Sequence, residues 1–208
     1  MPDQLIIEHC SPTLAGLKTG NLFSVRIKGK ENSYREIRSL NKILTKYGLR
    51  AIPVRCTEEF ALIYLYRPEF LSRDLSDPEA VEILEQMGYA SGRPEQCIVK
   101  LVRRLQESGA FPHEIGLFLG YPPTDVKGFM TSPTQGVKCT GFWKVYGDLD
   151  AALRTFSRYR KCTEAYRKEI GRGKSLEQLI VRIPACPRTA DESGAGQNSR
   201  RIPDKIAS

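Results

Sequence analysis

The sequence predicts a single α+β domain in which a mostly antiparallel sheet is packed by helices. Strand-like runs and helical stretches are mixed, without the regular strand–helix rhythm of a parallel α/β fold. The chain of 208 residues is 40% hydrophobic and 27% charged, which is the balance of a globular protein. A chain of this length buries a core without needing disulfides. No internal repeat indicates a solenoid.

Several segments of the N-terminal third have a recognisable period. Residues 11–17 begin with a Ser-Pro pair, which is typical of a helix N-cap followed by the first helical position. Apolar side chains alternate over 23–27 as in a strand, and those of 37–47 follow helical spacing up to a glycine. The runs 49–55 and 60–67 predict a hairpin, and the proline in the first run places that strand at an edge or a bulge.

The remainder of the chain is predicted to be mainly helical. Helices are expected over 78–87 and 94–109, each opened by a proline, and a long basic helix is expected to begin at Asp148 or Asp150. Short apolar runs predict further strands. These runs lie at 115–119, 142–146 and 179–183.

The apolar periodicity ends near Pro187. This predicts one globular domain over 1–186, followed by a disordered tail over 187–208. No apolar run approaches the roughly 20 residues that cross a bilayer, and the N-terminus lacks a signal-peptide pattern. We therefore expect a cytoplasmic protein without a membrane segment, whose six widely spaced cysteines are reduced thiols.

The net charge of +8 is concentrated between residues 154 and 174, where eight basic residues accompany two acidic ones. Such a stripe is either a solvated helix face or a docking surface for an acidic partner, with Arg158 and Lys161 at its centre. The chain has no helix-turn-helix, zinc-finger or aromatic RNA-binding motif, so a nucleic-acid partner is disfavoured.

Three residues form a candidate catalytic set. Cys10 stands just before the predicted helix start, where unpaired amides favour a thiolate. His113 opens the run 115–119 and is the predicted base, and Asp148 follows the last strand before the basic helix. This order is that of papain-like thiol enzymes, although papain's local motifs are absent. The alternative is that Cys10 is a small core residue and His113 an ordinary buried histidine.

Four segments carry a resemblance to a known family: His9–Lys18, Leu62–Pro68, Phe111–Pro122 and Cys139–Asp148. Together they resemble the uncharacterised bacterial family DUF3793, which is common in anaerobic Firmicutes. The resemblance covers roughly residues 6–181 and brings no established activity, cofactor or catalytic residue. Its members stand beside flavodoxin and ferrous-iron transport genes, which implies an iron- or redox-linked role.

Three function classes follow. The first is a thiol hydrolase or acyl transferase. The second is an iron, haem or redox accessory protein, for which His9, Cys10, His113 and Cys139 are the candidate ligands. The third is a basic module that docks an acidic protein such as a flavodoxin. The residues predicted to contribute to binding are His9, Lys18, Glu114, Tyr121, Arg158 and Lys161. The sequence specifies neither the cofactor nor the oligomeric state.

Overall fold

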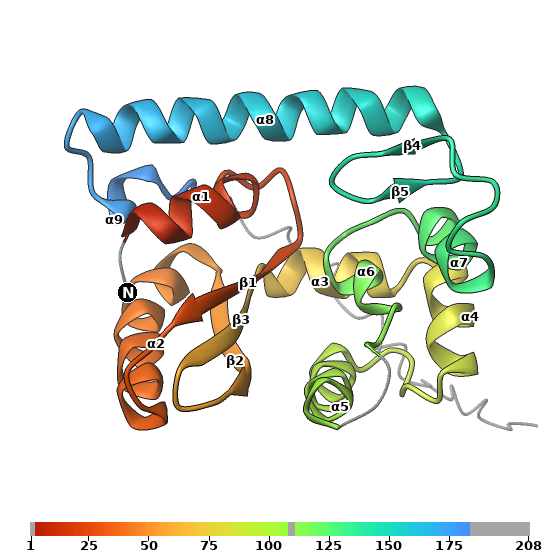
Figure 1. The fold of residues 1–208 in the computed structure, drawn as a ribbon, viewed down its shortest axis with the longest axis horizontal. Helices are drawn as coiled ribbons and strands as arrows, with labels where there is room; N and C mark the ends of the chain where they lie inside the picture. Colours follow the sequence, from red (N-terminus) through yellow and green to blue (C-terminus); the bar gives the residue numbers. More distant parts are fainter. Residues whose placement is uncertain (1–2, 108–110, 184–208) are drawn as a thin grey trace, which may run out of the picture.

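The computed structural model describes residues 3–107 and 111–183, and it confirms the α+β class (Figure 1). Helices surround an antiparallel sheet with the strand order β1-β3-β2, and a small β4–β5 hairpin lies apart from it. The strands are β1 (Gly20–Arg26), β2 (Arg50–Cys56), β3 (Phe60–Tyr66), β4 (Cys139–Thr140) and β5 (Lys144–Val145). The predicted tail over 187–208 and the domain boundary at 186 lie outside the described residues.

The helices include those predicted over 37–47 and 78–87, whereas the helix predicted over 94–109 ends at Gln106. The helices are α1 (Asp3–Leu14), α2 (Lys30–Leu44), the 3-10 helix η1 (Thr45–Tyr47), α3 (Pro68–Leu75), α4 (Pro78–Gln86), α5 (Pro94–Gln106), α6 (Ile115–Phe118), α7 (Pro123–Thr131), α8 (Leu149–Gly171) and α9 (Leu176–Leu179). In the described part of the chain, none of them is both long and apolar enough to cross a membrane.

Strand β3 is the centre of the sheet and contributes to two hydrophobic cores. Ala61, Ile63 and Leu65 enter the N-terminal core, which packs α1, α2 and α9 on one face of the sheet. Tyr64 and Tyr66 enter the central core, which packs α3 to α7 on the other face. Because neighbouring residues of a strand point to opposite faces, a strand buried on both sides is an unbroken apolar run.

The predicted β2–β3 hairpin is confirmed. Strand β2 is at an edge, and its pairing with β3 shifts between Pro53 and Arg55, so the proline marks both an edge and a bulge. The hydroxyl of Thr57 accepts hydrogen bonds from the amides of Glu59 and Phe60, which holds the turn.

The helix start predicted at Ser11 is wrong. Helix α1 begins at Asp3 and contains both Ser11 and Pro12, and the serine hydroxyl donates to the carbonyl of Ile7 instead of capping. The buried side chains of α1 share one face of the helix. These include Ile6, Ile7, Cys10 and Leu14. Their burial in the N-terminal core outweighs the local Ser-Pro signal.

Two short runs predicted as strands are also wrong. Residues 115–118 form the single-turn helix α6. Leu179 ends α9, and residues 180–183 pair with no strand in the described part of the chain. The side chains of α6 are buried on all sides, so no polar position reveals whether the period is 2 or 3.6. The run 142–146 is a strand only at β5.

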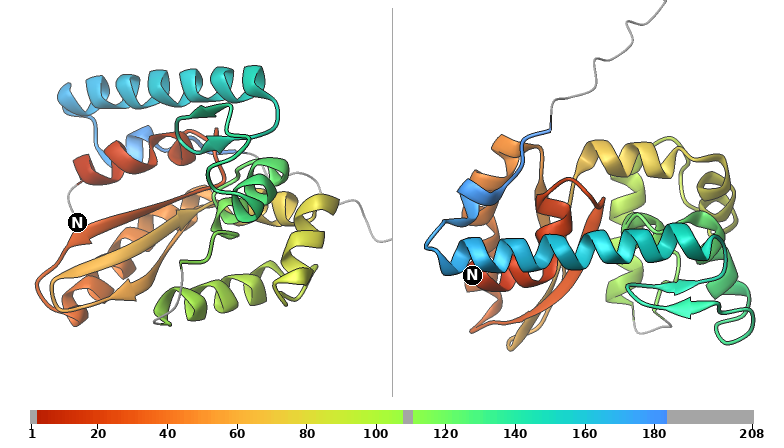
Figure 2. Two further views of the ribbon diagram at one scale, coloured as in Figure 1. Left: turned by 45° about the vertical axis from the view of Figure 1, so that its right-hand side comes forward. Right: turned by 90° about the horizontal axis from the view of Figure 1, so that it is seen from above.

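Helix α8 extends along the longest dimension of the molecule and lies beside α1 (Figures 1 and 2). The Asp148 side chain accepts the amide of Ala151, which confirms the predicted start of this helix. Its N-terminal half packs on the β4–β5 hairpin in a third cluster, the hairpin core. This core consists of Trp143, Val145, Ala152, Phe156 and Tyr159.

Arg67 connects segments that are far apart in the sequence. Its guanidinium donates to the carbonyls of Thr13 and Leu14 at the end of α1, to that of Val181, and to that of Tyr47. The side chain is buried, and its fork of donors adds further hydrogen bonds to the carbonyls of Thr13 and Leu14, which also accept the amides of Gly16 and Val181. A cation at this end also complements the helix dipole.

Candidate functional site

A polar cleft of about 360 Å³ opens where the α1–β1 turn, α3, the α6–α7 turn and α8 meet. We call it the Lys18 cleft. It is lined by charged residues of both signs and by tyrosines. They are Lys18, Arg73, Asp74, Asp77, Tyr121, Arg158 and Tyr159.

Two glycine turns build this cleft. Gly16 ends α1 with a φ of 72°, and the following amides of Leu17 and Lys18 both donate to the carbonyl of Pro12. Gly120 ends α6 with a φ of 74°, and a Cβ there would lie 2.7 Å from the hydroxyl oxygen of Thr19. The two turns therefore approach each other closely only because position 120 has no side chain.

Lys18 is the unusual residue of the cleft because its side chain is buried and lacks a counter-charge. The residue is 5% exposed, and within the described ranges its amine pairs with no carboxylate and reaches the solvent of the cleft. The Nζ atom lies 5.2 Å from the ring centroid of Tyr121, a cation–π contact that favours the ammonium form. Burial nevertheless lowers the pKa of Lys18 to about 8, an effect that the interaction with Cys10 partly opposes.

The acidic side chains of the cleft are already engaged. One carboxylate oxygen of Asp74 accepts the hydroxyl of Thr19. The other oxygen accepts the Nη2 and Nε groups of Arg73, at 2.7 and 2.9 Å. Asp77 caps α4 by accepting two backbone amides. In the described part of the chain, neither carboxylate forms an ion pair with the ammonium of Lys18.

The α8 side of the cleft adds a second cation and a neutral wall. Arg158 is exposed at the cleft and, in the part of the chain that the structure describes, pairs with no acidic residue. The hydroxyls of Tyr121 and Tyr159 donate to the carbonyls of Phe142 and Leu17, at 3.2 and 3.4 Å. Burial raises the pKa of both tyrosines to about 12, so they stay uncharged at neutral pH. The cleft therefore presents positive charge to a ligand.

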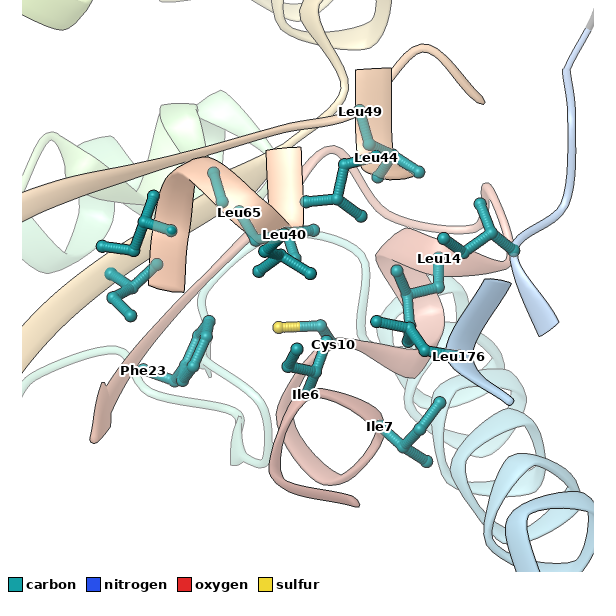
Figure 3. Packing of buried hydrophobic residues seen from close by; sticks show 14 of the residues in the cluster. Ile6, Ile7, Cys10, Leu14, Phe23, Leu40, Leu44, Leu49, Leu65 and Leu176 are labelled. Atoms are coloured by element: carbon teal, nitrogen blue, oxygen red, sulfur yellow. The ribbon is translucent and has the colours of Figure 1, made fainter. Parts of the chain in front are cut away.

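Cys10 does not stand at a helix N-terminus as predicted. Its side chain has no exposed surface and lies in the N-terminal core beside Ile6, Phe23 and Leu40 (Figure 3). Burial raises the pKa of the thiol well above its ordinary value, because an apolar core disfavours the thiolate. Cys10 is therefore a small core residue, which was the alternative interpretation of the sequence.

The structure does not bring the predicted catalytic set together. His113 is exposed, and its ring meets that of Phe129 edge-on at 4.9 Å, away from the core that contains Cys10. Asp148 is the N-cap of α8. The papain-like order of Cys10, His113 and Asp148 along the chain is therefore not an arrangement in space, because each residue belongs to a different element and environment.

Two other residues predicted to contribute to binding, His9 and Glu114, make contacts outside the Lys18 cleft. The ring of His9 stacks on that of Phe23 at 5.7 Å. Glu114 is buried, accepts the hydroxyl of Tyr89 at 2.7 Å and pairs with Arg104 at 3.1 Å. Its carboxylate therefore has polar partners within the central core. Among His, Cys, Asp and Glu side chains in residues 3–107 and 111–183, no group of three or more is placed to hold a metal ion.

Lys161 lies on the exposed face of α8, one turn beyond Arg158 and two beyond Arg154. This spacing places the three cations on one face of the helix, whereas Arg167 pairs with Glu8 on α1. Docking of an acidic partner on this face stays a prediction.

Sequence reasoning named Lys18, Tyr121 and Arg158 as binding residues but did not place them in one cleft. It missed Asp74 and Tyr159, which carry no motif. The available signal was a lysine in a segment of three residues between two glycines, Gly16 and Gly20.

The fold and the cleft define an α+β protein with a polar cleft whose lining carries more cationic than acidic side chains. The family model described as "Protein of unknown function (DUF3793)" matches residues 6–180, and the chain belongs to this family. No curated protein and no solved structure matched the chain.

The burial of Cys10 predicts that its thiol is inert in the folded protein. Iodoacetamide at pH 7 should leave Cys10 unmodified, while the partly exposed Cys56 and Cys139 serve as internal controls. Peptide mass spectrometry should detect modified Cys10 only after unfolding in denaturant. Labelling of native Cys10 as fast as that of Cys139 would contradict its assignment to the core.

Proposed function

We propose that the protein binds a small anionic compound in the Lys18 cleft, with the amine of Lys18 contacting the anion. The observation that carries this proposal is a lysine that is 5% exposed and has no counter-charge. Enclosing most of a lysine side chain without a counter-charge is costly even where its amine meets the solvent of the cleft, and perturbed groups of this kind are concentrated at functional sites.

The other groups of the cleft favour a carboxylate or a phosphate as the anionic part. The guanidinium of Arg158 has the planar donor geometry that matches either group, and its exposure lets it attract anions from solution. A cleft of about 360 Å³ is within the size range of small-molecule sites. Because Asp74 and Asp77 are engaged by other groups, neither supplies the counter-charge that an anion would bring.

The amine of Lys18 also has the means to exchange a proton with a bound compound. With a pKa of about 8, both the ammonium and the neutral amine are present near neutral pH. The ammonium donates hydrogen bonds to an oxyanion, whereas the neutral amine is a base or a nucleophile. Thr19 and Tyr159 limit the space around it but supply no competing charge.

Isothermal titration calorimetry with inorganic phosphate and with short mono- and dicarboxylates tests the proposal. We expect saturable binding to the wild type, and Lys18→Met should weaken it by roughly ten- to a hundredfold, the worth of one charge-assisted hydrogen bond. The matched control is Lys42→Met, because Lys42 is an exposed lysine of α2 outside the cleft. Equal binding by Lys18→Met, equal losses in the two variants, or no binding of any of these anions would contradict the proposal.

A further inference from the structure

A second cavity of about 400 Å³ lies between α6, α7 and the β4–β5 hairpin. We call it the aromatic pocket. Most of its wall is apolar, and Tyr121 lines both this pocket and the Lys18 cleft. The residues of the wall include Ile115, Leu119, Val126, Phe129 and Trp143. We infer that the aromatic pocket binds a small amphiphilic anion, with the apolar body inside and the charged group at the rim.

The wall of the pocket is held in place by ring contacts and one buried carboxylate. Trp143 stacks on Tyr121 at 4.8 Å and meets Phe156 edge-on at 4.5 Å. Its indole Nε1 donates to Asp125 at 2.7 Å. Aromatic rings fixed in this way form an apolar surface that exists before a ligand arrives.

Asp125 is the one carboxylate among the pocket's lining residues, and the protein already uses both of its oxygens. One oxygen accepts the indole of Trp143, and the other accepts the amides of Tyr146 and Gly147 at 2.8 and 2.7 Å. A cationic ligand would therefore find no free acceptor on this side chain. These hydrogen bonds give the buried carboxylate of Asp125 a structural role in the wall of the pocket.

The polar groups at the rim favour an anion. His113 is exposed, and its imidazole has no hydrogen-bond partner among the described residues. The ammonium of Lys144 lies 5.4 Å from the ring centroid of Phe129 and donates to the carbonyl of Pro133 at 2.8 Å, which leaves it two further hydrogens. An apolar interior with donors at one edge is complementary to a carboxylate that carries a hydrophobic chain.

Trp143 makes this inference directly measurable, because it is the only tryptophan of the chain. We would titrate the protein with decanoate below its micellar concentration and follow the tryptophan emission. Decanoate is expected to change the emission saturably, and hexanoate and decyltrimethylammonium to bind at least roughly tenfold more weakly, because one lacks apolar surface and the other carries the opposite charge. Inorganic phosphate, the probe for the Lys18 cleft, should not compete.

Substitutions then test whether His113 and Lys144 bind the charged group of the ligand at the rim. His113→Ala combined with Lys144→Met should weaken decanoate binding by roughly tenfold or more. His9→Ala is the matched control, because His9 is the other histidine of the chain and stacks on Phe23 outside the pocket. Thermal unfolding would verify that each variant is folded. Equal binding of decanoate and decyltrimethylammonium, competition by phosphate, or an equal loss in His9→Ala would overturn the inference.

Discussion

Lys18→Met is expected to stabilise the protein at pH 7 by up to about 3 kcal/mol, although it weakens the proposed anion binding. Burial lowers the pKa of Lys18 from 10.5 to about 8, so the folded state holds this proton less tightly than the unfolded chain does. A methionine of similar length fills the same space without a charge that must be desolvated. A residue that costs stability where it stands is expected where function requires it, which is the basis of the proposed role of Lys18.

The stabilisation by Lys18→Met depends on pH through the protonation of Lys18 in the folded and unfolded states. Below pH 8 the lysine is charged in both states, and the full cost of burying the charge is present. Between pH 8 and 10.5 the folded protein has lost the proton and the unfolded chain retains it, so the cost decreases as the pH rises. The stabilisation by Lys18→Met should therefore be largest below pH 8 and vanish towards pH 10.5.

Urea unfolding of the wild type and of Lys18→Met at pH 6 to 10 measures this difference. Lys42→Met, at an exposed position, should show no such profile. If Lys18→Met is less stable than the wild type at pH 7, the amine has a structural role and the functional interpretation of Lys18 loses its main support.

Arg67→Met is expected to have the opposite effect and to destabilise the protein by about 3–5 kcal/mol. The substitution removes four charge-assisted hydrogen bonds at a largely buried junction between α1 and the C-terminal segment, although the carbonyls of Thr13 and Leu14 keep the amides of Gly16 and Val181 as donors. Hydrogen bonds to a charged group are stronger than neutral ones, and the added methionine surface does not replace them.

Arg67→Lys separates charge from geometry. Lysine retains the positive charge but not the planar fork that reaches several carbonyls at once, so we expect an intermediate loss of stability. Urea unfolding at pH 7 compares both variants with the wild type. A change of less than about 1 kcal/mol in Arg67→Met would show that water replaces the guanidinium at this junction.

Local patterns predicted elements wherever one signal dominated. The run 60–66 is apolar or aromatic throughout because β3 is buried on both faces, and Pro53 marked the edge position and the bulge of β2. The acidic cap before the basic segment located the start of α8. The same reasoning failed at residues 115–119, since a short run without polar positions has no visible period.

The candidate catalytic set failed for a different reason. A Ser-Pro pair after Cys10 is a valid helix-start signal, but the apolar face of α1 continues across it into the N-terminal core. The burial of the Cys10 thiol depends on Phe23 and Leu40, which are distant in the sequence and cover it. A local motif states what a segment prefers when isolated, and long-range burial decides whether the preference is realised.

The sequence by itself determined the α+β class, the β2–β3 hairpin, the long basic helix and the membership of the family. It also singled out Lys18, Tyr121 and Arg158 as separate residues. Only the tertiary structure decided that these three line one cleft, that Lys18 is buried there without a counter-charge, and that His113 lies at the rim of an aromatic pocket. The physical reason is that charge, burial and pKa depend on neighbours in space, and the segments that form both sites are joined by packing rather than by sequence.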